Sequence, residues 1–240
     1  MKQKLWVFRL YACFVFCFVF QVKIFSQPIH KANVINSDQG LSQNSVYAIH
    51  RDVKGFLWIG TGDGLNRYDG KQVKVFRKTS SNSGSVLKGF SVHSMTEDNQ
   101  HNLWFSTERN LVQYHMPSQV FTEIIPFDDS ASYPGNKVLI DVDTLNNTIW
   151  LLQPAVCIFS YNYVTKKFKR FNLPGNATRK MIFLNSNAVL DAHGNIWMGS
   201  TDGLYGYDIK KNVWKQYYQG YELLRLCKDA FGKIWLLNEN

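Results

Sequence analysis

The chain has 240 residues, 45% of them hydrophobic and 15% aromatic, and its 27 Lys and Arg outnumber 18 Asp and Glu to give a formal net charge of +9. This composition excludes a disordered tail and is sufficient for one domain with a substantial core, or for two small ones. Four cysteines without a C-x-x-C pair exclude a disulfide-built scaffold and a cysteine zinc site.

Residues 1–26 are predicted to be a signal peptide. The segment begins with three basic residues, Lys2, Lys4 and Arg9. The apolar run 10–20 that comes next has 11 residues, which suits a secretory signal and is short for a membrane-spanning helix. We place cleavage between Ser26 and Gln27, with an uncleaved membrane anchor as the weaker alternative. The sequence therefore predicts an exported, periplasmic chain.

Cleavage would remove four cations and no acid, so residues 27–240 would carry 9 − 4 = +5. The remaining basic residues are scattered along the sequence, with pairs at Lys166-Lys167 and Lys210-Lys211 near predicted turns. Because the sequence shows no basic stripe of the kind that tracks a phosphate backbone, we expect no nucleic-acid partner.

Five tryptophans mark a repeat of about 46 residues. They are Trp58, Trp104, Trp150, Trp197 and Trp235, separated by 46, 46, 47 and 38 residues. Three residues before each lies a turn former: Gly55, His101, Asn147, Gly194 and Gly232. Six before lies an aspartate, with Thr144 as the exception: Asp52, Asp98, Asp191 and Asp229. Ten after lies a tyrosine, one residue late in the third unit: Tyr68, Tyr114, Tyr161 and Tyr207.

The first unit predicts four antiparallel strands, at 46–51, 56–61, 65–69 and 73–76, separated by Asp- and Gly-rich turns. Four such strands and then a restart predict an all-β fold, a β-propeller of about four and a half four-stranded blades. The predicted boundaries are a leader at 27–43 and blades at 44–88, 89–134, 135–180, 181–220 and, incomplete, 221–240. Within the leader, Lys31–Ile35 is predicted to be a ring-closing strand.

The repeated residues are interpreted as blade architecture. Each Trp would fill the wedge between neighbouring blades, and stacking of these rings on sugars is the lesser alternative. Gly60 and Gly199 would allow a close approach of backbone. Gly64 and Gly203 would supply turns with positive φ, with Asn110 in their place in the second unit. The full signature is Trp58, Gly60, Gly64, Tyr68, Trp104, Tyr114, Trp150, Tyr161, Trp197, Gly199, Gly203, Tyr207 and Trp235.

The third unit departs most from the pattern. It has Leu152 where the first unit has glycine, and residues 153–157 replace the Gly-rich turn. We favour a degenerate blade over a loop reshaped to bind a ligand.

No catalytic constellation, metal site or cofactor site is predicted. The histidines fall in different blades without a common spacing: His50, His93, His101, His115 and His193. The recurring aspartates are turn residues, and Asp128-Asp129 lies in a loop between blades. Cys157 and Cys227 fall in the third and fifth units, so we expect no disulfide between them. Ligand-binding residues are not predicted; the candidate loops are 80–88, 126–137 and 173–180.

Two units carry a resemblance to the two-component regulator propeller repeat. The first runs DQGLSQNSV at 38–46 and DVKGFLWIGTGDGLNRYDG at 52–70, and the fourth runs DAHGNIWMGSTDGLYGYD at 191–208. The opening after a signal peptide resembles the start of hybrid two-component sensors of Bacteroidetes-type bacteria. That resemblance implies an exported region with seven-bladed propellers, a membrane helix and a cytoplasmic histidine kinase, in a protein that senses oligosaccharides.

From this resemblance we expect the ligand-sensing segment of a hybrid histidine kinase, responding to a carbohydrate and forming a homodimer when anchored in the inner membrane. No kinase motif is present, so a kinase domain would lie beyond Asn240. Because the fifth unit breaks off there, we expect a fragment of a longer protein. The alternatives are a free-standing exported interaction module, and a propeller enzyme, which would need an acid, His or Arg cluster on one rim.

Overall fold

The computed structural model describes residues 33–77, 91–107, 110–124, 138–153, 157–173, 188–221, 223–229 and 231–238. The chain divides into two compact units, 1–34 and 35–240, and every assigned strand belongs to the second. The predicted signal peptide and its cleavage site lie outside the described residues. Residues 33–35 are assigned to no strand, and the rest of the predicted ring-closing strand lies outside the described part.

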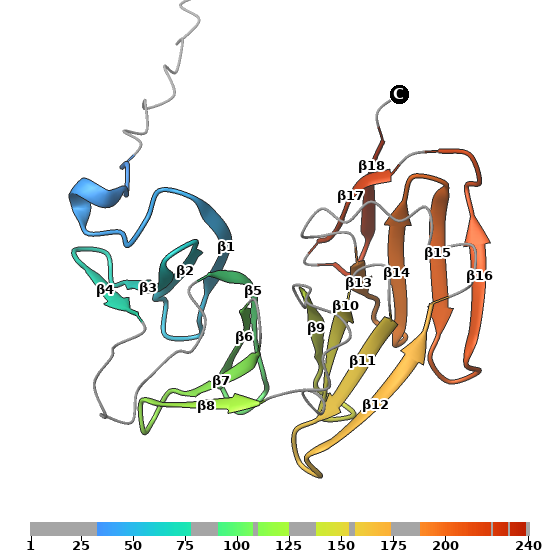
Figure 1. The fold of residues 1–240 in the computed structure, drawn as a ribbon, viewed down its shortest axis with the longest axis horizontal. Coiled ribbons are helices and arrows are strands. Elements are labelled where there is room, and N and C mark those ends of the chain that lie inside the picture. Colours follow the sequence, from blue (N-terminus) through green and yellow to red (C-terminus); the bar gives the residue numbers. More distant parts are fainter. Residues whose placement is uncertain are drawn as a thin grey trace, which may run out of the picture. The chain divides into compact units, whose positions relative to one another are not determined.

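The fold is a β-propeller architecture built of antiparallel blades, as the sequence predicts (Figure 1). Four blades have four strands each and the fifth has two. Blades 1 and 2 contain β1 (Val46–Arg51), β2 (Leu57–Thr61), β3 (Gly64–Tyr68), β4 (Val73–Phe76), β5 (Val92–Glu97), β6 (Leu103–Thr107), β7 (Leu111–His115) and β8 (Val120–Ile124). Blades 3, 4 and 5 contain β9 (Val138–Asp143), β10 (Thr148–Gln153), β11 (Cys157–Asn162), β12 (Lys167–Asn172), β13 (Ala188–Leu190), β14 (Asn195–Ser200), β15 (Gly203–Asp208), β16 (Val213–Tyr217), β17 (Leu223–Lys228) and β18 (Ile234–Asn238).

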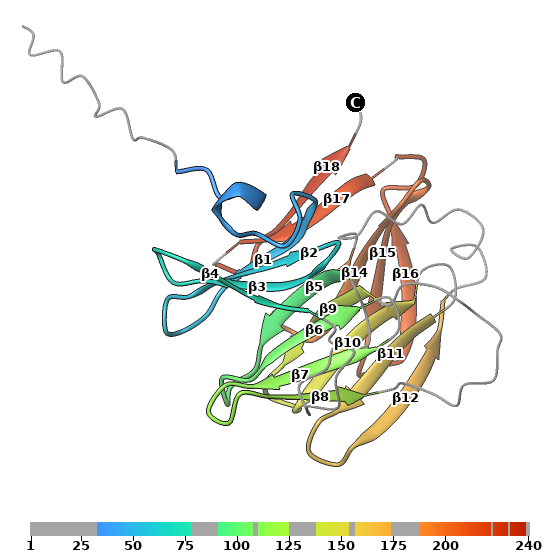
Figure 2. The same cartoon turned by 60° about the vertical axis from the view of Figure 1, so that its left-hand side comes forward.

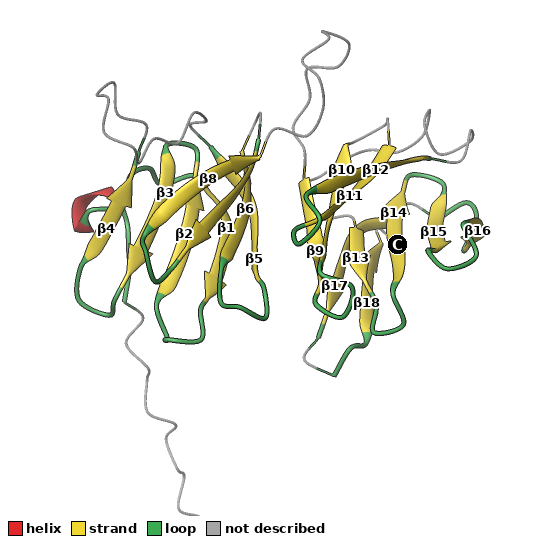
Figure 3. Ribbon diagram, turned by 90° about the horizontal axis from the view of Figure 1, so that it is seen from below, coloured by secondary structure: helices red, strands yellow, loops and turns green. Residues whose placement is uncertain are grey.

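Within each four-stranded blade the spatial order equals the chain order, so hairpins join all the strands (Figure 2). The first strands of successive blades contact one another in series, β1 with β5, β5 with β9, β9 with β13 and β13 with β17. We call these the inner strands, and the fourth strands of the blades the outer strands. Among the described residues there is no α-helix; the one helical element is a short 3-10 turn, η1 (Ser37–Gln39), red in Figure 3.

The hydrophobic core is divided among the interfaces between blades. One buried cluster joins blades 1 and 2 around Trp58, and a second joins blades 2 and 3 around Trp104. A third joins blades 3 and 4 around Trp150, and a smaller one joins blades 4 and 5 around Leu204. A blade that lies between two others packs a hydrophobic face against each of them. Each blade therefore depends on its neighbours to bury its apolar side chains.

The turns use the residues that the sequence singles out. The positions three before each Trp all have positive φ: Gly55 at 87°, His101 at 62°, Asn147 at 52°, Gly194 at 84° and Gly232 at 80°. Gly64 and Gly203 have φ of 115° and 123°, in the second turn of their blades. Only Gly, and to a lesser extent Asn and His, adopt this region without strain.

The late tyrosine of blade 3 is in register with the others. Tyr68, Tyr114 and Tyr207 each pair with the residue just before the Trp. Tyr161 pairs likewise with Ile149, because Gln153 opposes Cys157 across a loop with one more residue than in blades 1 and 4. The extra residue is therefore absorbed in the loop, and the blade keeps its pairing.

The segment before β1 is fixed to blade 1 by a small polar network. Ser42 N donates to Asn66 Oδ1 at 2.9 Å, and Asn66 Nδ2 donates back to Ser42 Oγ at 2.8 Å. Ser42 Oγ also bonds Thr61 Oγ1 at 2.7 Å. Asn66 and Thr61 are fully buried, so these bonds satisfy polar groups that would otherwise be costly.

Candidate functional site

Each recurring aspartate except that of blade 3 holds the indole of its own blade. Trp58, Trp104 and Trp197 donate from Nε1 to Asp52, Asp98 and Asp191 Oδ2, each at 2.8 Å, and Trp235 donates to Asp229 at 2.9 Å. The other carboxylate oxygen caps the turn, for example by accepting from Phe56 N at 2.9 Å. The sequence pointed only to the turn role; the constant spacing of six residues was the signal for the second.

The five tryptophans differ in burial according to whether a complete blade packs beyond them. Trp58, Trp104 and Trp150 are 1%, 0% and 4% exposed and pack against the next blade. Trp197 is half-buried against blade 5, and Trp235 in β18 is 60% exposed. Packing within the blade, such as Phe76 against Trp58 at 5.8 Å, is therefore completed by the next blade along the chain.

Blade 3 lacks the bond between aspartate and indole. The turn between its first two strands has one residue more than that of blade 1. Asp143 pairs with Thr148 across this turn, as Asp52 does with Phe56 in blade 1. Both Asp143 oxygens are occupied by Asn146, from its backbone N at 3.1 Å and its Nδ2 at 2.7 Å. Trp150 Nε1 is buried with no partner among the described residues. The amide of Asn146 has replaced the indole as the donor.

We expect Trp150→Phe to destabilise the chain less than Trp104→Phe, by about 1–2 kcal/mol. Both changes lose similar ring volume, but only Trp104→Phe also breaks a bond to a buried carboxylate. Trp150→Phe instead removes an unsatisfied donor. Urea unfolding of the two variants measures the difference, and equal losses would contradict this account.

Two glycines lie where the neighbouring blade comes closest. A Cβ built on Gly60 would lie 2.6 Å from Val92 O on β5, and one on Gly199 would lie 3.1 Å from Leu223 O on β17. The second turn is closed by a hydroxyl three residues after Trp: Thr61 Oγ1 donates to Gly64 O at 3.1 Å, and Ser200 Oγ to Gly203 O at 3.0 Å. Thr107 Oγ1 donates likewise to Asn110 O at 3.2 Å. Sequence reasoning missed these hydroxyls.

The signature tyrosines are core residues, with one exception. Tyr114, Tyr161 and Tyr207 are buried, and burial raises the pKa of each phenol above its ordinary value. Tyr68 is only half-buried, and its hydroxyl donates to Gly70 O at 2.8 Å. None of these groups is arranged as an acid or base toward a reacting atom.

The Asp191 carboxylate is held in its charged form. Its partial burial alone would raise its pKa, but bonds from the Trp197 indole and from Asn195 outweigh burial and hold the pKa below its ordinary value of 3.8. A carboxylate whose pKa is depressed on folding stabilises the fold above pH 3.8 and loses that contribution as the pH falls through the lower value.

We therefore expect the stability difference between wild type and Asp191→Asn to shrink in acid. At about pH 6 the full contribution of the carboxylate is present, and at about pH 3 much of it is lost. Urea titrations of both proteins at the two pH values measure the change. A difference that is the same at both would show that the charge of Asp191 does not matter.

Polar side chains connect the inner strands of blades 1 and 2. Glu97, at the end of β5, accepts a bond from the neighbouring blade, Val53 N, at 3.3 Å, and lies 3.3 Å from His50 Nε2. Its other oxygen lies 2.9 Å from His101 Nδ1 in the next turn. The Glu97 side chain is only 12% exposed, so both histidines help to satisfy a largely desolvated carboxylate.

A second group of polar contacts begins at Thr96, the neighbour of Glu97 on β5, and reaches blades 3, 4 and 5. Thr96 Oγ1 lies 3.4 Å from Asp141 Oδ1 on β9. Asp141 Oδ2 pairs with Lys228 Nζ at 2.7 Å, from β17 two blades away, and the same ammonium donates to Leu190 O at 2.9 Å. We call His50, Glu97, His101, Thr96, Asp141 and Lys228 the inner polar chain. It links all five blades and offers donors and acceptors, without a nucleophile beside a base.

The remaining titratable candidates stay apart. His93 is buried and stacks on Tyr47 at 5.1 Å, His115 Nδ1 lies 2.7 Å from Ser118 Oγ, and His193 is exposed in its turn. Cys157 and Cys227 do not form a disulfide, and Cys157 Sγ lies 3.8 Å from Gln153 Oε1. Within the described ranges no group of three or more His, Cys, Asp or Glu is placed to hold a metal ion. Nor does any helix there have the length and apolar character needed to span a bilayer.

The loops proposed as ligand sites fall almost entirely outside the described residues. This applies to 80–88 and 126–137, including Asp128-Asp129, and to all of 173–180 except Leu173, which is buried. Residues 154–156 of the altered blade 3 turn also lie outside. Among the residues that the structure describes, the inner polar chain is therefore the candidate functional site.

Two segments of the chain match the family model of the two-component regulator propeller, residues 40–63 and 89–109. They cover the starts of blades 1 and 2, including the aspartate turn and the tryptophan of each. These two segments are thus similar to the two-component regulator propeller repeat, in agreement with the resemblance identified from the sequence.

The curated protein Histidine kinase P4 of Formosa agariphila is 49% identical to this chain over 47 residues, 20% of this chain and 3% of that protein. Two solved extracellular domains assigned to hybrid two-component systems of Bacteroides thetaiotaomicron superpose with TM-scores of 0.68 and 0.59, at 20% and 22% identity. The match covers 86% of this chain and 30% and 34% of theirs.

A gluconolactonase from Xanthomonas campestris also superposes, with a TM-score of 0.55 at 9% identity over 80% of this chain and 69% of that one. Structural similarity at these identities establishes the fold alone. The chain spans about a third of the length of the B. thetaiotaomicron domains and a small part of the curated relative.

Proposed function

We propose that this chain, whose first two blades contain segments similar to the two-component regulator propeller repeat, is the extracytoplasmic ligand-sensing part of a two-component signalling protein. The observation that carries this proposal is the repeat match at residues 40–63 and 89–109. It is supported by superposition on extracellular domains assigned to hybrid two-component systems. The segment matched in a histidine kinase points to the same class of output.

The proposal extends to a carbohydrate ligand, a periplasmic location and a homodimer anchored in the inner membrane. A histidine kinase domain would belong to the same signalling protein but to none of the residues described above. The inner polar chain gives such a sensor a physical means of coupling, because a ligand that displaces one member changes contacts between neighbouring blades. A sugar hydroxyl can both donate to Glu97 or Asp141 and accept from Lys228.

An immunoblot of fractionated cells tests the signalling assignment. An antibody against blades 1–4 is expected to detect a membrane-associated band several times heavier than a 240-residue chain. A soluble envelope band of the size of this chain would overturn the kinase assignment and favour a free-standing interaction module.

Thermal unfolding with a panel of oligosaccharides tests the ligand class. A ligand that binds only the folded state raises the free energy of unfolding by RT ln(1 + [L]/Kd), so a saturating sugar is expected to raise Tm. The variant Lys228→Met, which loses the contacts to Asp141 and Leu190, should lose that rise, while Lys54→Met on an exposed turn should keep it. No rise with any sugar would count against a carbohydrate ligand.

A further inference from the structure

The positive charge of the chain is concentrated on two neighbouring hairpins. The hairpins 157–173 of blade 3 and 203–217 of blade 4 contain seven basic residues and one acid, so they carry 7 − 1 = +6. The rest of residues 27–240 has 16 basic and 17 acidic residues, a net charge of −1. The fold places the basic residues of the two hairpins on neighbouring outer strands.

The acid in these hairpins neutralises one lysine. Asp208 Oδ2 pairs with Lys211 Nζ at 2.9 Å. The other six cations are exposed and have no carboxylate partner within the two hairpins; we call them the basic edge: Lys166, Lys167, Lys169, Arg170, Lys210 and Lys215. The basic edge runs along the outer strands β12 and β16 and the turns that precede them.

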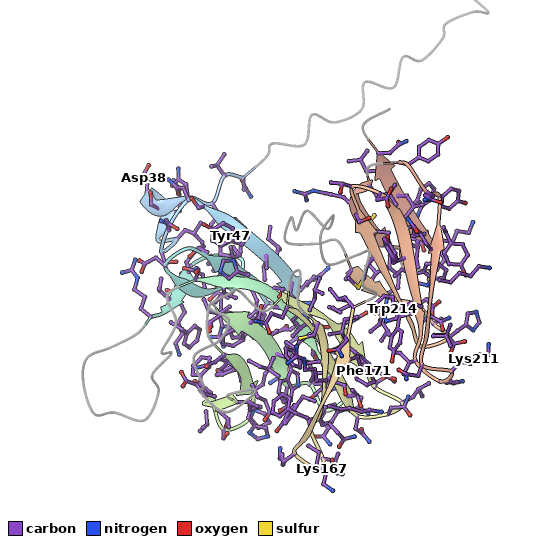
Figure 4. All side chains as sticks on the ribbon, turned by 45° about the vertical axis from the view of Figure 1, so that its right-hand side comes forward. Asp38, Tyr47, Lys167, Phe171, Lys211 and Trp214 are labelled. Atoms are coloured by element: carbon purple, nitrogen blue, oxygen red, sulfur yellow. The ribbon has the colours of Figure 1, made fainter. Side chains whose placement is uncertain are left out.

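The two outer strands form one continuous surface. Trp214 Nε1 on β16 donates to Asn172 O on β12 at 3.2 Å, and Trp214 and Phe171 both pack on the core cluster shared by blades 3 and 4. Figure 4 shows Lys167 and Lys211 at the hairpin turns, with Phe171 and Trp214 on the strands behind them. Lys169 Nζ lies 4.8 Å from the centre of the Phe171 ring. Half-buried aromatic rings are therefore interleaved with ammonium groups.

A role in shielding sheet edges does not account for this distribution. Lysines on outer strands prevent edge-to-edge association. That role would apply equally to blade 2, yet its outer strand β8 carries no basic residue and contains Glu123. The outer strands β4 of blade 1 and β16 of blade 4 carry one basic residue each, Lys74 and Lys215, whereas β12 of blade 3 carries three. The accumulation is therefore greatest on blade 3, beyond what shielding of an edge requires.

We propose that the basic edge binds an acidic oligosaccharide, a sugar chain bearing sulfate or carboxylate groups. Lys167 and Lys169 pair with Asn162 and Ser160 and so share one face of β12, where alternate side chains start about 7 Å apart. A row of charges along a strand fits a linear chain with repeated anionic groups. The ammonium group of lysine is a hydrated point charge, so it can bind such groups without the fixed bidentate geometry that arginine favours. The aromatic rings beside it can pack against the apolar faces of sugar rings.

This inference deepens the proposed function, on which it rests for the carbohydrate class. A membrane surface fits less well, because the cations extend along the strand instead of lying only at the turn tips. We expect no nucleic-acid partner, because the proposed function places this segment outside the cytoplasm.

The test compares binding of oligomeric dextran sulfate, oligogalacturonate and neutral dextran of equal length to the purified chain by calorimetry. We expect both acidic oligomers to bind, neutral dextran not to bind, and affinity to fall as salt rises from about 0.05 M to about 0.15 M. The variant Lys167→Glu/Lys169→Glu should bind the acidic oligomers at least about tenfold more weakly. Its matched control, Lys54→Glu/Lys71→Glu on exposed turns of blade 1, changes net charge equally and should stay within about twofold of wild type.

Circular dichroism checks that each variant is folded. If Lys167→Glu/Lys169→Glu does not fold, the neutral variant Lys167→Gln/Lys169→Gln is measured in its place. Equal weakening by the control variant would overturn the proposal, since attraction would then depend on net charge alone. Binding to phosphatidylglycerol vesicles but not to the acidic oligomers would assign the edge to a lipid surface and overturn it too. Stabilisation by a neutral sugar alone would overturn this inference while leaving the proposed function in place.

Discussion

Replacing Trp104 by alanine is expected to lower the free energy of unfolding by about 3–5 kcal/mol, and the same change at Trp235 by less than about 0.5 kcal/mol. The two residues occupy the same place in the repeat and both donate to an aspartate. They differ in burial, since Trp104 is 0% and Trp235 60% exposed. The larger loss combines the transfer of a large ring, a cavity between blades 2 and 3, and the loss of the indole bond to Asp98, which keeps its bonds from Asn102.

Urea denaturation of both variants, monitored by far-ultraviolet circular dichroism, measures the two losses. The Trp235 variant is the control, because it removes the same atoms and the same kind of bond from an exposed position. Equal losses would mean that the indole stabilises its own blade and not the interface with the next. The spacing of the tryptophans in sequence would then be unrelated to packing between blades.

The propeller fold could be predicted from sequence because its determinants are local and repeated. The strand that contains Trp58, the turn that begins at Asp52 and the glycine with positive φ all lie within a few residues of one another. Short-range turn chemistry and strand propensity set such features. Five near-copies then make a weak local signal strong, including for blade 3, whose extra residues are absorbed in its loops.

Contacts between blades could not be predicted in the same way. Lys228 and Asp141 are 87 residues apart, and Glu97 and His50 are 47 apart. Both pairs depend on which side chain of an inner strand faces the neighbouring blade. A shift in strand register changes which side chains face the neighbouring blade. Such shifts occur in the pairing of β1, β5, β9 and β17 with the second strand of each blade, and the sequence did not reveal them. The inner polar chain and the basic edge are thus products of tertiary structure.

In blade 3 the recurring aspartate is displaced by one position and not lost. In sequence, Thr144 stands in place of the recurring aspartate. In the structure the aspartate is present as Asp143, one position earlier, because the turn is longer by one residue. The consequence is chemical, since Asn146 takes the carboxylate and Trp150 loses its acceptor. At this turn, the departure of blade 3 from the repeat is therefore a specific lost hydrogen bond.

Gly60→Ala is expected to cost about 2–3 kcal/mol, and Gly199→Ala about 1 kcal/mol or less. Neither glycine requires positive φ, so the entropic gain from replacing glycine is similar at both and cancels in the comparison. The difference lies in the atoms that the new methyl group meets. At Gly60 it meets the backbone oxygen of Val92 at 2.6 Å and Met95 Cε at 3.0 Å, and at Gly199 its nearest contact is 3.1 Å.

Backbone cannot yield as a flexible side chain does, so at Gly60 the two inner strands must separate. Val92 pairs with Thr107 within blade 2, and moving it would disturb both that pair and the cluster around Trp58. Ser106 and Leu152 stand at the equivalent position in blades 2 and 3. Thermal unfolding of the two alanine variants measures the order of the effects. If Gly199→Ala were the more damaging, the approach between blades 1 and 2 would not be the tightest constraint on how the blades stack.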